Sequence, residues 1–170
     1  IPKDGYVVKV IDNPKNPEFK LAIVTAIEKR EVFYGAVDFV DDYFASAVPH
    51  NGSLRQTQDL FTKKMPDYYN ASAPKIKTRS VFTWGHPIND YREYIENMAR
   101  LRLNQLIIWN DYAPVNAKDI VDYAHSFGIK IIWGYAWGWS TNCAEISLDT
   151  LPELSRSVLD KYEREYADIG

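Results

Sequence analysis

A repeat in the second half of the chain constrains its fold more than any other feature. Trp84, Trp109 and Trp133 each lie at or near the end of an apolar, β-branched segment, and they are 25 and 24 residues apart. That spacing matches the length of one strand, one turn, one helix and a second turn. Successive βα units place their strands parallel in one sheet. The repeat therefore predicts an α/β fold.

The elements of this half follow from periodicity and from turn residues. Apolar runs predict strands, and apolar positions spaced by three and four residues predict helices, at 79–85 (strand), 90–103 (helix), 105–110 (strand), 116–127 (helix), 129–135 (strand) and 149–167 (helix). We expect Leu101 on the inner face of the first helix. Asn116 is the expected N-cap of the second helix, which Gly128 ends. Asp149 or Thr150 opens the third.

The first half reads as a smaller α/β unit. Two β-branched runs at 6–11 and 20–26 flank a Pro/Asn turn, and 30–44 has helical periodicity, with an apolar face that includes Val32 and Val40. Residues 45–74 are predicted to be a connector, with a possible short strand or turn around Leu60. A domain boundary is expected near Pro74. The predicted domains are therefore 1–74 and 75–170.

Composition excludes several classes of protein. The 170 residues carry a formal net charge of -3 and no run of Lys and Arg, which argues against a nucleic-acid partner. No apolar stretch approaches the roughly 20 residues that cross a membrane. Cys143 is the single cysteine and is expected to be a small buried side chain. His50 and His125 lack metal-ligand spacing, so neither a metal nor another cofactor is expected.

Two architectures fit parallel βα units: an open doubly wound sheet and a (β/α)₈ barrel. A nucleotide-binding sheet usually has a Gly-rich turn after its first strand. The turn here, Trp84-Gly85-His86-Pro87, has one glycine, beside a Trp and a Pro. This favours the barrel.

Aromatic and polar residues gather where the predicted strands end. In either architecture the carboxyl ends of the strands lie at one edge, which brings together Trp84, His86, Trp109, Asn110, Asp111, Trp137 and Trp139. Flat rings match the C–H face of a sugar, and amide or carboxylate groups bond its hydroxyls. The pattern predicts a carbohydrate site. In the alternative interpretation, the strand tryptophans pack in the barrel interior or against the helix layer and bind no ligand. We expect this for Trp133. Arg79, at the start of its strand, either caps the sheet or reaches into a barrel.

Residues 73–110, APKIKTRSVFTWGHPINDYREYIENMARLRLNQLIIWN, resemble the first two barrel units of the β-N-acetylhexosaminidases of glycoside hydrolase family 20. Phe33-Tyr34-Gly35-Ala36 is similar to the helix of the small α/β domain that precedes that barrel. The α-glucuronidases of family 67 and the O-GlcNAcase-like enzymes of family 84 share this layout.

The resemblance implies the end of a small α/β domain followed by the first three βα units of a truncated (β/α)₈ TIM barrel. It implies a fragment of a retaining hydrolase that acts on a terminal sugar, with a secreted or periplasmic location. Arg79 is similar to the arginine that holds sugar hydroxyls in those enzymes. Their catalytic carboxylates follow the fourth strand, so no catalytic residue is expected in this chain, and its partner would be the remainder of its own barrel. The alternatives are a non-catalytic carbohydrate-binding or interaction module on the same scaffold, and a nucleotide-binding α/β domain.

Overall fold

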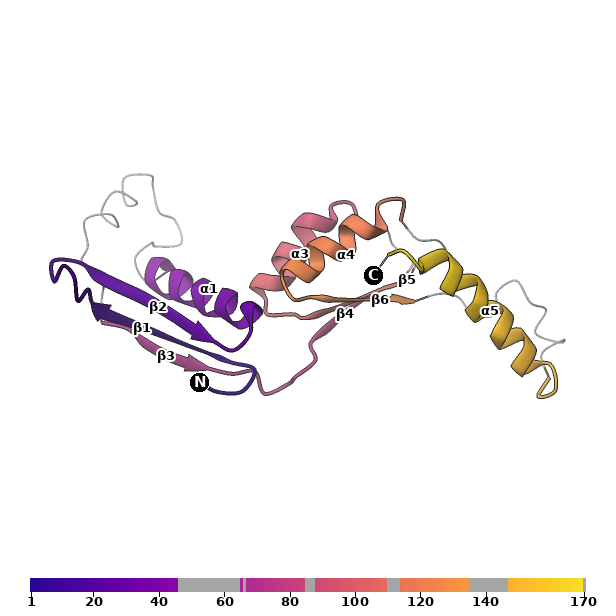
Figure 1. The fold of residues 1–170 in the computed structure, drawn as a ribbon, viewed down its shortest axis with the longest axis horizontal. Coiled ribbons are helices and arrows are strands. Elements are labelled where there is room, and N and C mark those ends of the chain that lie inside the picture. The colour runs from indigo at the N-terminus through magenta and orange to yellow at the C-terminus, as the bar shows by residue number, and fades with distance from the viewer. Residues whose placement is uncertain (46–64, 66, 85–87, 110–113, 135–146, 170) are drawn as a thin grey trace. The chain divides into compact units, whose positions relative to one another are not determined.

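A computed structural model of the chain describes residues 1–45, 65, 67–84, 88–109, 114–134 and 147–169. The chain forms two compact units, Ile1–Lys77 and Thr78–Gly170, which we describe separately (Figure 1). Unit 1 is an antiparallel three-stranded sheet with a helix, and unit 2 contains parallel βα units in an unclosed sheet. The prediction of an α/β protein is confirmed at this level.

Unit 1 is built around its central strand. The strands β1 (Tyr6–Asp12), β2 (Lys20–Ala26) and β3 (Tyr69–Ser72) lie in the order β2-β1-β3, and both pairings are antiparallel. Alternate residues of β1 point to one face, where Tyr6, Val8 and Val10 are buried. Helix α1 (Lys29–Ala45) packs on β1 and β2, and Tyr34 joins the core that they form.

A glycine allows α1 to approach this sheet closely. A Cβ atom at Gly35 would lie 2.6 Å from Val24 Cγ1 and 2.8 Å from Tyr6 Cδ2. Both distances are shorter than atoms in contact allow, so a side chain here would force α1 and the sheet apart.

Unit 2 contains the repeat. The strands β4 (Ser80–Trp84), β5 (Gln105–Trp109) and β6 (Lys130–Gly134) lie side by side in sequence order, and all are parallel. They alternate with α3 (Tyr91–Arg100) and α4 (Ala117–Ser126), and α5 (Leu151–Tyr166) follows β6. Figure 1 shows α3 and α4 on one side of this sheet. Leu106 and Ile108 of β5 are fully buried on that side, with Ile95 of α3 and Ala124 of α4.

Several sequence expectations need correction in unit 1. Residues 69–72, which we expected in the connector, form β3, because the backbone of this polar segment pairs with β1. The position around Leu60 lies outside the described residues. Val32 and Val40 are exposed although both belong to the apolar face expected for α1, because that face is wider than the strip that contacts the sheet.

Unit 2 also departs from expectation at the helix ends. Helix α3 ends at Arg100, before the expected 103, and Arg102 then adopts a left-handed φ of 60°. Leu101 is consequently 72% exposed. Asn116 occupies the N-cap position of α4, but its side chain makes no capping hydrogen bond. Strand β4, expected to be buried, has one exposed face.

Candidate functional site

One face of the unit 2 sheet is exposed, and its residues follow from the strand period. Side chains alternate between faces, and the register pairs Trp84 with Trp109 and Trp109 with Gly134. The face opposite the buried Leu106 and Ile108 therefore contains Ser80, Phe82, Trp84, Gln105, Ile107, Trp109, Lys130, Ile132 and Gly134. We call these nine positions the open face.

Three rings on the open face contact one another, and we call them the aromatic cluster. The ring centroids of Trp84 and Trp109 are 4.4 Å apart with an interplanar angle of 58°. Phe82 lies 5.9 Å from Trp84 and 6.0 Å from Trp109. Trp84 is nevertheless 65% exposed and Phe82 is 47% exposed. Large contiguous apolar surface of this kind marks a site of interaction.

The character of the open face changes along the strands. The first layer, at the amino ends, is polar: Gln105 Nε2 donates to Ser80 Oγ at 2.6 Å, and Lys130 follows on β6. The middle layer is apolar, with Phe82, Ile107 and Ile132 in register. The last layer, at the carboxyl ends, contains Trp84, Trp109 and Gly134. The two tryptophan rings thus lie at the edge where parallel α/β sheets place their functional loops, and Phe82 lies one layer below them.

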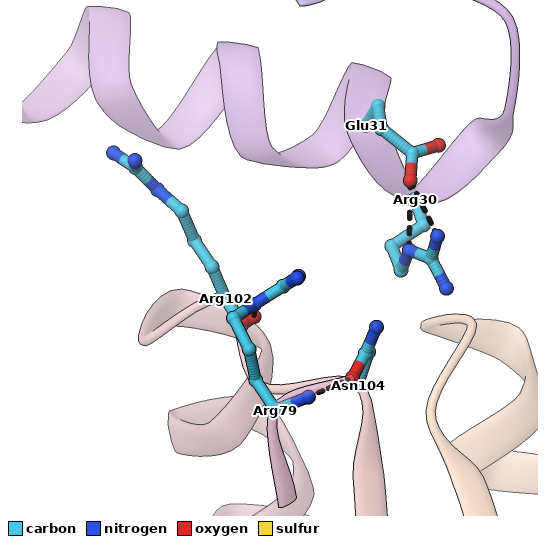
Figure 2. Close-up of polar contacts among 5 residues, drawn as sticks. All are labelled: Arg30, Glu31, Arg79, Arg102 and Asn104. Carbon is cyan, nitrogen blue, oxygen red and sulfur yellow. Dashed lines mark hydrogen bonds and ion pairs between the residues drawn. The ribbon is translucent and has the colours of Figure 1, made fainter. Parts of the chain in front are cut away.

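Arg79 lies at the other end of β4. Its backbone N–H donates to Asn104 Oδ1 at 2.8 Å, and its Nε donates to the carbonyl oxygen of Arg102 at 2.5 Å (Figure 2). Arg102 is the residue after α3 whose φ is 60°. The guanidinium of Arg79 therefore binds the turn that follows α3. The structure does not bring Arg79 together with Trp84 and Trp109.

Of the predicted site residues, the structure brings together Trp84 and Trp109. The remaining predicted positions, His86, Asn110, Asp111, Trp137 and Trp139, lie outside the described residues. Trp133 lies on the opposite face of the sheet, where its ring centroid is 5.4 Å from that of Tyr166 on α5. This is the packing position that the sequence predicted for it. Burial, followed by the negative charge of Glu165 and by Tyr162, raises the pKa of Tyr166 to about 12.

Sequence reasoning missed a buried ion pair in unit 1. Glu31, in the first turn of α1, is 2% exposed, and its Oε1 accepts from Arg30 Nε at 2.9 Å and from Nη2 at 2.6 Å (Figure 2). Its Oε2 is buried without a hydrogen-bond partner among the described residues. Two consecutive charged residues at a helix start look like solvated surface in sequence, so no pattern signalled this burial.

The part of the chain that the structure describes contains neither a metal-binding cluster nor a membrane-spanning helix. No group of three or more His, Cys, Asp or Glu side chains there is arranged to hold a metal ion. Within the same ranges, no helix combines the length and apolar character that crossing a bilayer requires.

Neither a protein-family model nor a curated protein matches this chain.

Proposed function

We propose that the aromatic cluster binds carbohydrate, as part of a glycoside hydrolase that acts on a terminal sugar. The observation behind this proposal is the contact between Trp84, which is 65% exposed, and the half-buried Trp109, at the carboxyl ends of two adjacent parallel strands. A pyranose has an apolar C–H face that packs on a flat ring, and Trp offers the largest such surface. Two rings inclined at 58° offer surfaces in two directions.

The layers of the open face support the barrel proposal. In a (β/α)₈ barrel, inward-pointing side chains fill the interior in layers, and the active site lies at the carboxyl ends of the strands. The apolar middle layer, Phe82, Ile107 and Ile132, would fill such an interior. The last layer, with Trp84 and Trp109, would lie at the carboxyl end of the barrel, where the active site is found. We propose that β4, β5 and β6 are the first three strands of such a barrel, as the resemblance to the family 20 hexosaminidases implies.

In this proposal the chain contributes sugar binding, and the acid–base carboxylates of a retaining hydrolase would come from elsewhere in the barrel. None of the nine open-face positions is acidic. That observation equally favours the second candidate, a non-catalytic carbohydrate-binding module on the same scaffold. Arg79 is left out of the proposed site because it binds the turn at the amino end of the sheet.

Binding is tested by calorimetric titration of the chain with a panel of soluble oligosaccharides, including N-acetylglucosamine and glucuronic acid forms. Replacing Trp84 by Ala should weaken binding by about 1–3 kcal/mol, the scale of an aromatic contact. The matched control is Trp133→Phe, a tryptophan on the opposite face of the same sheet, which should leave the affinity unchanged. Equal affinity for Trp84→Ala and the parent chain would exclude the aromatic cluster as the site.

Catalysis is tested separately on a panel of p-nitrophenyl glycosides, with this chain and with the longest natural form of the protein that contains it. Turnover by the longer form supports the hydrolase. Binding without any turnover in either form would favour the binding module.

A further inference from the structure

Gly134, the last residue of β6, differs from the other open-face positions. It is the one member of the nine without a side chain, and the register places it next to Trp109. The last layer therefore consists of two tryptophans and a glycine on three neighbouring strands. Glycine weakens a strand, because it loses more conformational freedom on folding than other residues and has no side chain to pack. A glycine here lowers the stability of β6 unless the fold requires it.

The fold does not require it. The φ of Gly134 is not in the left-handed range, so the backbone conformation is open to any residue. A Cβ atom at this position would lie 3.4 Å from Trp109 Cβ and 3.6 Å from the carbonyl oxygen of Ile108. Both are ordinary contact distances. Gly35 is different, because a Cβ atom there would overlap Val24 and Tyr6.

The missing side chain leaves one side of Trp109 open. On β4, the rings of Phe82 and Trp84 lie 6.0 Å and 4.4 Å from that of Trp109, so they cover the indole from one side. On β6, the neighbour in the same layer is Gly134, which contributes only backbone. Among the residues that the structure describes, the last layer therefore has a gap on the β6 side of the half-buried Trp109.

A gap of this kind suits a ligand. Glycine in a strand often marks a place where a ligand approaches the backbone closely. A flat indole next to such a gap offers its face to the C–H face of a sugar ring. A side chain at residue 134 would occupy the same space, because its Cβ would already contact Trp109.

Building on the carbohydrate site proposed above, we propose that Gly134 is a specificity-determining residue of that site. Its lack of a side chain admits a sugar ring to the β6 side of Trp109, over the end of β6. Trp84 then flanks the ligand site from β4. The cost of a glycine in the strand is offset by binding, which is the usual relation between stability and activity at a functional position.

The test measures binding and stability together in Gly134→Ala and Gly134→Val. Binding is followed by calorimetric titration of the whole chain with N-acetylglucosamine oligosaccharides and, separately, with glucuronic acid oligosaccharides. Gly134→Ala should weaken the binding of at least one probe about threefold, and Gly134→Val, which fills more of the gap, should weaken it about tenfold or more. The urea midpoint of Gly134→Ala should stay the same or rise, because alanine has less freedom to lose on folding.

The matched control is Lys130→Ala, on the same strand and the same face but in the first layer. It should leave the affinity unchanged. A glycine with a purely structural role would give the opposite pattern, in which Gly134→Ala lowers the urea midpoint and keeps the affinity of the parent chain.

Two results would overturn the role of Gly134 and leave the carbohydrate site standing: unchanged affinity in both Gly134 variants while Trp84→Ala loses binding, or a lowered urea midpoint in Gly134→Ala. If the parent chain binds neither probe, the carbohydrate site itself fails, and the role of Gly134 fails with it. The two failures are therefore distinguishable.

Discussion

The two N-cap positions of unit 2 differ in the structure, and this difference predicts different stabilities for two matched variants. Asp90 Oδ1 accepts from the backbone N–H of Arg92 at 2.9 Å and from that of Glu93 at 3.0 Å. Asp90→Ala leaves both N–H groups to water and also removes a negative charge at a helix N-terminus. The expected cost is about 1 kcal/mol and at most about 2 kcal/mol. Asn116 makes no such bond, so Asn116→Ala should change the free energy of unfolding by less than about 0.5 kcal/mol.

The assay is urea unfolding followed by tryptophan fluorescence. All five tryptophans of the chain lie in unit 2, so this signal reports that unit alone. A loss of 1 kcal/mol should lower the melting temperature of a unit of this size by roughly 4–8 °C. If Asn116→Ala costs as much as Asp90→Ala, the amide caps α4 after all.

Three further predictions test packing and ionisation. Leu106→Ala, at a fully buried position, should cost about 2–5 kcal/mol, whereas Phe82→Ala, on the open face, should cost about 1 kcal/mol or less. Equal costs in urea unfolding would show that the open face is packed in the native protein. Gly35→Ala should destabilise unit 1 by about 1–3 kcal/mol, measured by hydrogen exchange of its amides, and unchanged protection would refute the close approach of α1. The neutral form of Tyr166 is favoured by folding, so its contribution to stability should be complete below pH 10 and lost as the pH rises toward 12. Ultraviolet titration should find a tyrosine that ionises near pH 12, and in Tyr166→Phe that step should disappear.

Most of unit 2 could be predicted from sequence because its signals are local. The apolar runs of β4, β5 and β6 and the helical periodicity between them recur at nearly constant spacing, and each repeat supports the others. The end of α3 was harder to locate. Leu101 continues the apolar period, but the chain turns at Arg102, which has a positive φ. Arginine does not favour this conformation, so the sequence carries no glycine or asparagine signal for the turn.

Strand β3 shows what a local pattern omits. Its residues, Tyr69 to Ser72, have no apolar alternation, and they form a strand because β1 offers an unpaired edge. The partner is more than fifty residues away in sequence. Pairing of this kind depends on a tertiary contact with β1, and the sequence of residues 69–72 alone carries no signal of that partner.

The candidate site was predicted in part. The strand period places Phe82 and Trp84 on one face and Val81 and Thr83 on the other, and the pairing of Trp84 with Trp109 follows from equal strand lengths. Both faces of β4 contain apolar residues, so the sequence could not show which face the helices cover.

Gly134 ends the last layer of the open face and leaves the row of rings incomplete. A Cβ atom there would lie 3.4 Å from Trp109 Cβ, which is close but ordinary contact, and its φ is not in the left-handed range. The backbone therefore does not require glycine at this position. Residue 134 is therefore a point at which the proposed carbohydrate site can be probed: a series of increasingly large side chains would narrow the space beside Trp109 stepwise, leaving the sheet that supports it unchanged.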